Sequence, residues 1–267
     1  ILLNITPDHL DRYDGFEAYA TSKSRLFAMQ GRGQHSIARF TDARSLGQFA
    51  EGSIASILED VFQHRGIAPD EQNGWKSLAG SHNRENAAAA IEACDILGIP
   101  IDQIREGLRT YPGLPHRMER VAEIGGVAYV NDSKGTNTAA SAPALAAFEN
   151  IHWIVGGLAK EPGLGECEAE LGHVKAAYTI GRSGDEFARL LEKRVSIKRS
   201  VTLEQALFDA SNAAVSGDTV LLSPACASFD QFKSFETRGD AFRKQATGLI
   251  RIFEREKVEH QLRGDAA

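Results

Sequence analysis

The chain has 267 residues, which is long for one domain and sufficient for two. Hydrophobic residues make up 42% of the sequence and charged residues 25%, as is ordinary for a soluble globular protein. The net charge is -6 with acids and bases interspersed, which disfavours a nucleic-acid or membrane-surface role, because both usually need a concentrated basic face.

The chain begins with "ILLNITPDHLD", which contains neither an initiator methionine nor a signal-peptide pattern. Ile1, Leu2, Leu3 and Ile5 predict a buried strand that is already under way at the first residue. Because a domain rarely starts with its core strand, we expect the chain to be part of a longer protein.

The segment "TPDHLD" follows this strand and places Asp8, His9 and Asp11 at its carboxyl end. One interpretation is a polar turn that begins at Pro7. The other is a functional loop, because carboxylate oxygens and an imidazole at a strand end can ligate a metal. Both interpretations stay open on the residues alone.

The next predicted helix, "FEAYATSKSRLFAM", carries a lysine within its apolar stripe. The positions that share this helix face are Phe16, Tyr19, Ala20, Lys23, Leu26 and Phe27. Lys23 can extend its ammonium past the stripe into water, or it can be buried for chemistry, because a buried lysine readily changes protonation state. A neutral amine can take up carbon dioxide to form a carbamate that ligates magnesium, and His9 lies a short helix upstream.

Residues 35–80 predict a mixed region of short strands and turns, followed by helices over residues 81–98 and 102–110. The first of these helices begins with "SHNRENAAAA", where Ser81 or Asn83 is the expected N-cap. Asn86 lies just inside the helix, and its amide either caps or reads the edge of a purine ring.

Two prolines and a glycine within "TYPGLPHR", residues 110–117, predict a linker, because these residues disfavour a helix. The domain boundary is expected here, with the first domain over residues 1–113 and the second over residues 114–267.

The second domain alternates apolar runs with helical patterns. Strands are predicted at residues 127–132, 152–157, 176–181, 195–201 and 218–224, and helices at residues 138–149, 185–193, 203–215 and 235–257. Apolar strands without a polar face, separated by helices, indicate a parallel sheet covered on both faces. Such sheets bind ligands at the carboxyl ends of their strands.

Polar residues that suit an anionic ligand follow two of these strands. "NDSKGTNTAA" contains Lys134 and opens a helix, and "GGLAK" ends in Lys160. Amides and hydroxyls at a helix N-terminus bind phosphate or carboxylate groups. Each segment alone is also compatible with an ordinary turn, and the sequence contains no GxxxxGK[ST] phosphate loop.

The three cysteines, Cys94, Cys167 and Cys226, are far apart and form no CxxC pair. They are typical of cytosolic thiols and not of a disulfide framework or a zinc site. No apolar run approaches the roughly 20 residues of a membrane span. We therefore expect a cytoplasmic protein without membrane insertion.

Six features occur in the order in which the Mur ligases carry them. They are "TPDHLDRY", a lysine on the next helix, "SHNRENAAAA", "GLPHRME", "NDSKGTN" and "SPACASFDQF". The chain therefore resembles this family from Leu3 to about Lys244, in particular its D-glutamate-adding branch. The most specific stretch is "SPACASFDQFKSFETRG", whereas the "HN" and "HR" pairs are shared across the wider family.

The resemblance implies an α/β fold in which a Rossmann-like, doubly wound parallel sheet follows the second part of an α/β ATPase central domain. The family's UDP-binding domain, its phosphate loop and a magnesium-binding glutamate have no counterpart in this sequence. We therefore expect the chain to be inactive by itself.

The family pattern also implies roles for the matched residues. His9 and Lys23, the latter as a carbamate, would bind Mg²⁺. The ATP residues would be Asn83 and Asn86 at the base, Asp132 at the ribose, Lys134 at the phosphates, and His116 and Arg117 at the domain junction. The D-glutamate residues would be Thr136, Lys160, Ser228, Phe229 and Phe235. The small residues before Ser228 would leave space for the amino acid.

The implied reaction is ATP-dependent amide formation between D-glutamate and UDP-N-acetylmuramoyl-L-alanine through an acyl phosphate, in peptidoglycan synthesis. It implies ATP and Mg²⁺ as cofactors, small-molecule substrates, no nucleic-acid partner, and a monomer. Two alternatives stay open. Another amide ligase of this fold, such as a different Mur enzyme or a folylpolyglutamate synthetase, would need a different sequence at "ACASFDQF". A non-catalytic nucleotide-binding or scaffold module is favoured by the missing phosphate loop for this chain, although not for the longer protein of which we expect it to be part.

Overall fold

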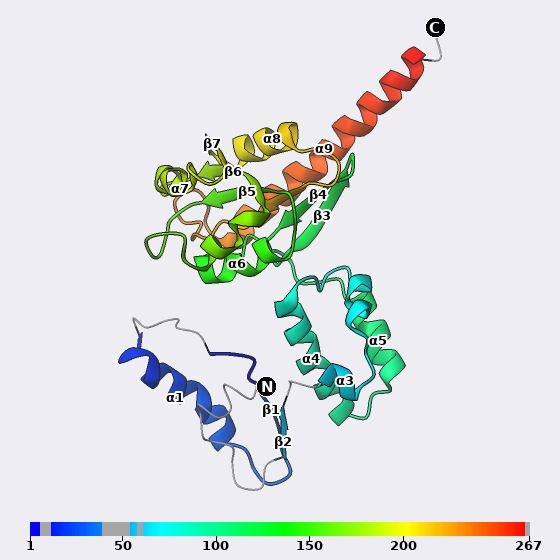
Figure 1. The fold of residues 1–267 in the computed structure, drawn as a ribbon, viewed down its shortest axis with the longest axis vertical. Helices are drawn as coiled ribbons and strands as arrows, with labels where there is room; N and C mark the ends of the chain where they lie inside the picture. Colours follow the sequence, from blue (N-terminus) through cyan, green and yellow to red (C-terminus); the bar gives the residue numbers. More distant parts are fainter. Residues whose placement is uncertain (6–11, 39–53, 58–60, 265–267) are drawn as a thin grey trace. The chain divides into compact units, whose positions relative to one another are not determined.

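The computed structural model describes residues 1–5, 12–38, 54–57 and 61–264, with the stretches 54–57 and 250–264 described by their backbone alone. The chain divides into two compact units, Ile1–Tyr111 and Pro112–Ala267, and each has its own hydrophobic core (Figure 1). The division falls within the proline-containing segment 110–117.

The first unit is mostly helical in its described part. Its elements are α1 (Gly15–Ala28), β1 (His35–Ala38), β2 (Ile54–Ile57), α3 (Val61–His64), the 3-10 helix η2 (Pro69–Gly74), α4 (Ser81–Ile96) and α5 (Ile101–Thr110). β1 and β2 pair in parallel. The alanine-rich face of α4 lets Ile91 pack closely against Ile104 and Leu108 of α5.

The strand predicted at the N-terminus is not formed. Leu2 makes a single parallel bridge to Ala38, with its N–H donating to the carbonyl oxygen of Ile37 at 2.8 Å. Ile1 is 55% exposed and is therefore not part of a core. The first five residues therefore make one bridge to β1 instead of a ladder.

The buried face of α1 also differs from the predicted stripe. Its buried residues are Tyr19, Ala20, Ser24 and Phe27. Phe16 and Leu26 are 38% and 50% exposed. Lys23 is exposed, with Nζ 5.3 Å from the ring centre of Tyr19. The described cluster under this helix is small, and consists of Phe27, Ala38 and Leu2, so it covers a narrower face than the stripe.

The second unit is built on a six-stranded sheet with the order β3-β4-β8-β5-β6-β7. The strands are β3 (Glu119–Ile124), β4 (Val127–Asn131), β5 (Ile151–Gly156), β6 (Val174–Ile180), β7 (Ser196–Val201) and β8 (Thr219–Leu222). Every neighbouring pair is parallel except β3–β4. The predicted parallel sheet is therefore confirmed, and the last strand in sequence, β8, lies between β4 and β5.

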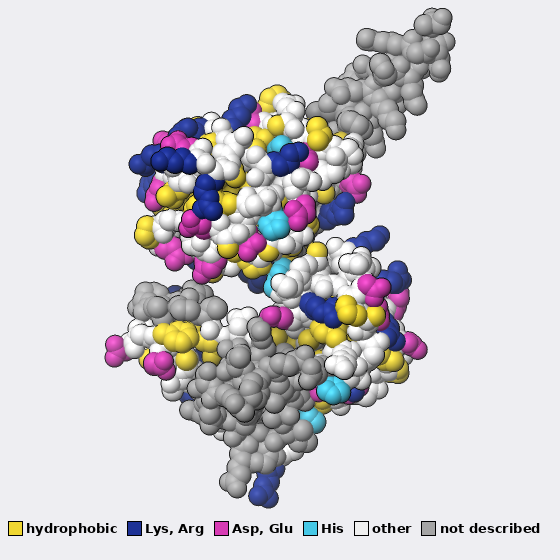
Figure 2. All heavy atoms as spheres, in the orientation of Figure 1, with side chains coloured by type: hydrophobic (Ala, Val, Ile, Leu, Met, Phe, Trp, Pro, Cys, Tyr) yellow, Lys and Arg dark blue, Asp and Glu magenta, His cyan; other side chains and the backbone are white. Residues whose placement is uncertain are grey.

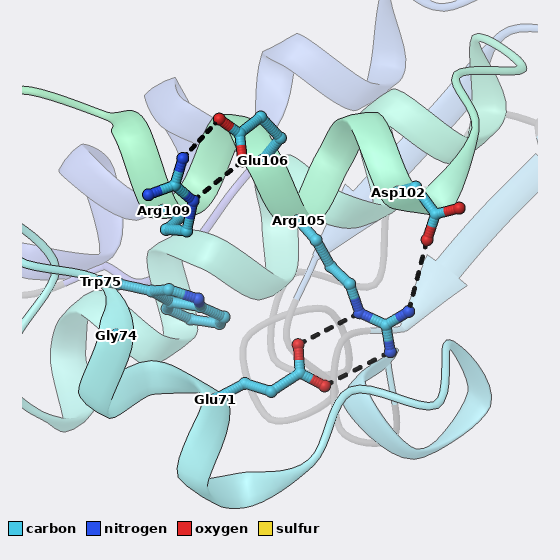
Figure 3. A pocket seen from close by; sticks show the side chains of 7 residues that line it. All are labelled: Glu71, Gly74, Trp75, Asp102, Arg105, Glu106 and Arg109. Atoms are coloured by element: carbon cyan, nitrogen blue, oxygen red, sulfur yellow. Dashed lines mark hydrogen bonds and ion pairs between the residues drawn. The ribbon is translucent and has the colours of Figure 1, made fainter.

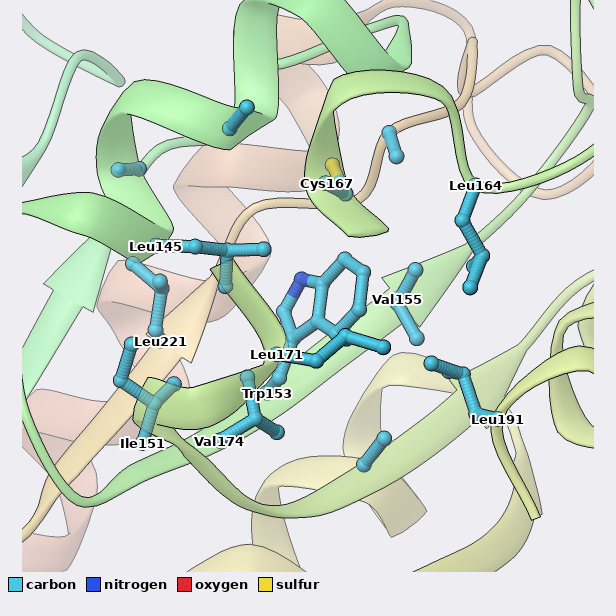
Figure 4. Close-up of a cluster of buried hydrophobic side chains, with 14 of the residues drawn as sticks. Leu145, Ile151, Trp153, Val155, Leu164, Cys167, Leu171, Val174, Leu191 and Leu221 are labelled. Atoms are coloured by element: carbon cyan, nitrogen blue, oxygen red, sulfur yellow. The ribbon is translucent and has the colours of Figure 1, made fainter. Parts of the chain in front are cut away.

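Helices cover both faces of this sheet, as predicted (Figure 1). α6 (Thr138–Ala146), the 3-10 helix η3 (Gly165–His173) and α7 (Gly184–Leu191) pack on one face. α8 (Leu203–Ala213) and α9 (Phe235–Gly264) pack on the other. Figure 4 shows Trp153 at the centre of the first of these cores, and its indole N–H donates to the carbonyl oxygen of Ser223 at 2.7 Å.

The antiparallel edge strand β3 was not predicted. It forms a hairpin with β4 through Gly125 and Gly126, whose φ angles of 58° and 78° suit the tight turns of β-hairpins. The sequence of β3, "ERVAEI", is mostly charged or partly exposed because it lies at the sheet edge. It therefore lacks the continuous apolar run that marks the buried strands.

Candidate functional site

Three adjacent strand ends bring most of the predicted ligand residues of the second unit together. β8 pairs with β4 on one side and with β5 on the other, so the segments that follow these strands leave the same edge of the sheet. Residues 132–136 follow β4, Lys160 follows β5, and Ser228 follows β8. Parallel sheets bind their ligands at this edge.

Asp132 is buried directly after β4. Its carboxylate accepts hydrogen bonds from Ser223 Oγ at 2.7 Å and from the N–H of Met118 at 3.2 Å. Burial raises the pKa of Asp132 to about 7, against the opposing effect of these bonds and of the Arg117 and Arg238 charges. A ligand group that donates to this carboxylate would stabilise its charged form.

His116 is buried beside β4 in the left-handed backbone conformation, with φ 62°. Its Nδ1 lies 3.0 Å from Asn131 Nδ2, and its carbonyl oxygen accepts the N–H of Lys134 at 3.1 Å. A Cβ on Gly239 of α9 would collide with His116 Nδ1. The ring of His116 therefore packs against α9, while its backbone supports the Lys134 loop.

Lys134 and Arg117 are exposed cations at this edge. Lys134 Nζ lies 4.7 Å from the ring centre of Phe235, the first residue of α9. The ring of Phe235 also meets His116 edge-on, at 6.1 Å between ring centres. The structure thus brings Lys134, expected at the phosphates, into contact with Phe235, expected at the amino acid.

Lys160 is exposed, and its Nζ donates to Thr136 Oγ1 at 3.5 Å. The segment that carries Lys160 is tied to the segment after β8, because Leu158 and Ala227 exchange two backbone hydrogen bonds of 2.9 and 3.0 Å. This pairing places Lys160 and Ser228 on two joined loops.

The hydroxyl of Ser228 has no hydrogen-bond partner within the described part of the chain, although the residue is only 3% exposed. Leaving a buried hydroxyl unpaired costs about 1–3 kcal/mol, so such a group is expected to have a partner that the chain itself does not provide. The neighbouring Phe229 is 71% exposed. This turn therefore combines an unsatisfied polar atom with an uncovered aromatic side chain.

In the first unit, Asn83 and Asn86 lie one turn apart at the start of α4. The expected N-cap was wrong: the cap is Gly80, whose φ of 86° needs a glycine, and no side chain caps the helix. Asn83 Nδ2 donates to the carbonyl oxygen of Ala79 at 2.9 Å, and Asn86 Nδ2 donates to Asn83 Oδ1 at 3.2 Å. The two amides therefore present one joined polar face.

Of the two predicted metal ligands, only Lys23 is described, whereas His9 lies outside the described residues together with Asp8 and Asp11. Among the described residues, no group of three or more His, Cys, Asp and Glu side chains could hold a metal ion. Lys23 is exposed, so of the two interpretations of this residue the structure favours a lysine that extends its ammonium into water over one that is buried for chemistry.

A small pocket in the first unit lies apart from the predicted ligand residues (Figure 3). It is lined by Glu71, Gly74, Trp75, Asp102, Arg105, Glu106 and Arg109. Arg105 Nε donates to Glu71 Oε2 at 3.1 Å, and Arg109 Nη2 donates to Glu106 Oε1 at 2.7 Å. Because carboxylates already pair with both arginines, this pocket offers little to an anion.

Two residues at the sheet edge, Ser133 and Arg238, were not predicted from the sequence to belong to the site. Arg238 lies in the first turn of α9, is 1% exposed, and hydrogen-bonds to Ser133. The positive end of the helix dipole disfavours a cation in that turn. An arginine at this position of a predicted helix is therefore the feature of the sequence that could have identified Arg238 as a functional candidate.

On the face shown in Figure 2, lysine and arginine side chains are interspersed with aspartate and glutamate and do not gather into one basic area. None of the described helices combines the length and hydrophobicity needed to cross a membrane.

Comparison with solved structures supports the fold. MurF ligase from Thermotoga maritima, solved in complex with ADP, aligns with a TM-score of 0.62 at 17% identity, covering 92% of this chain and 62% of that one. Escherichia coli FolC aligns with a TM-score of 0.54 at 20% identity, covering 89% and 58%. At these identities the likeness concerns the fold alone.

Comparison of sequences identifies the family. The family model for the Mur ligase middle domain matches residues 1–59, and the model for the Mur ligase, glutamate ligase domain matches residues 116–226. The UDP-N-acetylmuramoylalanine–D-glutamate ligase of Novosphingobium aromaticivorans is 51% identical over 249 residues, which is 93% of this chain and 56% of the relative. That of Sphingopyxis alaskensis is 48% identical over 254 residues, or 93% and 58%. The chain thus spans little more than half the length of these curated relatives, and it belongs to the Mur ligase family, on the branch of the UDP-N-acetylmuramoylalanine–D-glutamate ligases.

Proposed function

We propose that the protein adds D-glutamate to UDP-N-acetylmuramoyl-L-alanine in an ATP-dependent reaction of peptidoglycan synthesis in the cytoplasm, acting as a monomer. Relatives that match 93% of the chain carry the name of this ligase. The structural observation that supports the proposal best is the buried, unpartnered hydroxyl of Ser228 on a loop joined to that of Lys160.

The proposed amino-acid site lies at the carboxyl ends of β4, β5 and β8, in the domain that we assign to residues 114–267. Lys160 and Thr136 would bind one carboxylate of D-glutamate, since the ammonium and the hydroxyl already lie 3.5 Å apart. Ser228 would donate its free hydroxyl hydrogen to the distal carboxylate. Phe229 and Phe235 would border the carbon chain of the amino acid.

The proposed ATP residues come from both domains. Asn83 and Asn86 would bind the base, because their amides offer donors and acceptors on one helix face. Asp132 would accept a hydrogen bond from a ribose hydroxyl. The phosphates would be met by Lys134, whose loop is held by the carbonyl of His116, and by the exposed Arg117.

In the proposed reaction the substrate carboxylate attacks the γ-phosphate of ATP, which gives an acyl phosphate and ADP. The D-glutamate amine then attacks the acyl carbon, so the amide C–N bond forms while inorganic phosphate leaves and the amine loses a proton. The residues of this chain would act mainly by holding the reactants in place and by neutralising phosphate charge.

Mg²⁺ would be held by the imidazole of His9 and by a carbamate on Lys23. Bound there, it would offset the negative charge of the phosphates. This assignment rests on the match of His9 and Lys23 to the family pattern, because the exposed position of Lys23 does not itself favour carbamate formation.

A chimera tests the proposed function. Residues of the Novosphingobium aromaticivorans relative that align with this chain are replaced by this chain, and ATP-dependent phosphate release is measured with UDP-N-acetylmuramoyl-L-alanine and D-glutamate. The chain by itself is assayed in parallel, and we expect it to be inactive. Turnover of the chimera with D-glutamate, but not with L-glutamate or glycine, is the expected result. A chimera that folds and prefers another amino acid would contradict the proposal.

Replacing Ser228 by alanine in this chimera should raise the KM for D-glutamate about 10- to 100-fold, because a hydrogen bond to a charged group contributes about 1.5–3 kcal/mol. The KM for ATP should change little. The matched control is Ser211→Ala in α8, whose hydroxyl donates to the carbonyl oxygen of Leu207 and also hydrogen-bonds with Tyr129, and neither partner belongs to the proposed amino-acid site. Equal KM values for Ser228→Ala and Ser211→Ala would show that Ser228 does not bind the amino acid.

A further inference from the structure

Arg238 joins two of the loops that form the edge of the sheet. Its Nε donates to Ser133 Oγ at 3.0 Å, and its Nη2 donates to the carbonyl oxygen of Ser133 at 2.8 Å. Nη1 and Nη2 both donate to the carbonyl oxygen of Cys226 at 3.1 Å. A single guanidinium therefore holds the loop after β4 against the loop after β8.

The placement of this cation is unfavourable in three respects. The residue is 1% exposed, and burial lowers the pKa of Arg238 to about 10. Within the described part of the chain, no carboxylate accepts a hydrogen bond from Arg238, so its charge is not directly paired. It also lies in the first turn of α9, at the positive end of the helix dipole. An arginine with these costs is expected to perform a task that a neutral residue could not.

The role of Arg238 follows from the proposed ligand residues that lie on the two loops. Ser133 stands between Asp132 and Lys134, whereas Cys226 precedes Ser228 by two residues. The Ser133 hydroxyl also donates to the carbonyl oxygen of Phe235 at 2.8 Å, so the start of α9 is fixed to the same point. The guanidinium thus connects the ATP side of the proposed site to its amino-acid side.

Two serine hydroxyls also join these segments. Ser223 Oγ, directly after β8, donates to the carboxylate of Asp132, directly after β4, at 2.7 Å. The Ser141 hydroxyl of α6 donates to the carbonyl oxygen of Gly135 at 3.2 Å and accepts the N–H of Ala225 at 3.0 Å. This single hydroxyl reaches one acceptor on the first loop, whereas Arg238 reaches two acceptors on Ser133 and one on Cys226. Arg238 therefore makes more hydrogen bonds between the two loops than either serine.

We propose that Arg238 is a positioning residue that sets the distance between the Asp132–Thr136 loop and the Ser228 loop, and thereby the fit of the amino-acid site. The identity of the amino acid rests on the proposed function, whereas the connection of the loops does not. A lysine keeps the charge but presents a compact ammonium, so it cannot reproduce the planar fork that spans both loops.

Hydrogen exchange of the 267-residue chain tests the connection without any ligand. The amides of Lys134, Gly135, Ala225 and Ala227 are hydrogen-bonded in the two loops. In Arg238→Lys we expect these amides in both loops to exchange at least about tenfold faster, while amides of β6 and α8 keep their rates. The control is Leu207→Ala, which leaves a cavity in the core cluster under α8, a cluster that contains no residue of 132–136 or 224–228. It should lower stability without raising loop exchange relative to the sheet.

Calorimetry with D-glutamate tests the consequence for the site. In the chimera described above, Arg238→Lys should weaken D-glutamate binding about tenfold or more, and Leu207→Ala should leave it unchanged. If the parent chimera binds no D-glutamate, the proposed function fails, and the exchange experiment alone then decides the role of Arg238.

Faster exchange in both loops, together with weaker binding, would support the proposal. Faster exchange in only one loop, unchanged exchange, or wild-type affinity in Arg238→Lys would overturn it. If Arg238→Lys does not fold, Ser133→Ala takes its place, because it removes the acceptor of Nε and leaves the guanidinium in place. This variant should raise exchange in both loops by a smaller factor, and an effect confined to residues 132–137 would overturn the proposal.

Discussion

At the scale of single residues, the buried carboxyl group of Asp132 at the sheet edge makes the stability of the folded protein depend on pH. Burial raises its pKa from 3.8 to about 7, so folding favours the protonated carboxyl group. Its contribution to stability is therefore complete below pH 3.8 and is lost as the pH rises through about 7.

Asp132→Asn should remove this dependence. The free energy of unfolding of the wild type, measured in urea from pH 4 to pH 8, should fall relative to the variant until about pH 7 and then run parallel to it. The total fall should be on the order of a few kcal/mol. Curves that run parallel over the whole range would show that Asp132 is charged in the folded protein at low pH.

Two glycines of α9 make a matched pair at the same scale. A Cβ on Gly239 would collide with His116 Nδ1, whereas among the side chains that the structure describes nothing lies within 4 Å of the corresponding position at Gly248. Alanine favours helix over glycine by about 1 kcal/mol, so Gly248→Ala should stabilise the protein by up to that amount. Gly239→Ala should destabilise it by about 1–3 kcal/mol, because His116 has to move. Chemical unfolding of both variants checks this, and equal effects would contradict the close contact.

At the scale of elements, a buried carboxylate joins three strands at the amino ends opposite the proposed site. Asp218, just before β8, accepts from His152 of β5 at 3.0 Å and from Lys175 of β6 at 2.9 Å. Because the carboxylate can only accept, His152 donates to it from Nε2, and the His152 Nδ1 lies 2.9 Å from the Tyr178 hydroxyl. Burial raises the pKa of Asp218, but the bonds to Lys175, to the N–H of Val215 and to His152 outweigh this effect and lower it.

Asp218→Asn should therefore destabilise the sheet by about 2 kcal/mol at pH 7, less than for a fully buried pair because Lys175 is 44% exposed. The difference from the wild type should shrink as the pH falls through the lowered pKa of Asp218. The control is Glu123→Gln, which breaks the exposed pair with Arg120 and should stay within about 0.5 kcal/mol. Equal unfolding midpoints for the two variants would show that Asp218 does not hold the strands together.

At the scale of the whole molecule, the sequence predicted the parts of the second unit better than their arrangement. The buried strands β4, β5 and β8 were predicted because they are mostly apolar runs, and α9 because its pattern is long. The order of the strands was not, because the position of β8 between β4 and β5 depends on packing between distant segments. The role of Arg238 could not be predicted for the same reason, because its two partners, Ser133 and Cys226, lie on loops that are distant from each other in the sequence.

In the first unit, the sequence predicted the helix α1 but not which of its residues are buried. The stripe of α1 has clear helical spacing, yet Phe16 and Leu26 are exposed, and among the described residues the cluster beneath this helix consists of Phe27, Ala38 and Leu2. Periodicity predicts which residues share a face, but only the surface available for packing decides how much of that face is buried.

The late position of β8 in the chain has a consequence for biosynthesis. When the ribosome has made residues 112–213, β4 and β5 are complete, but the strand that separates them has not been translated. Each then exposes an unpaired edge, which is the kind of surface that recruits neighbouring nascent chains. Final closure of the sheet has to await residues 219–222, so slowing translation just before them should increase aggregation of the newborn protein.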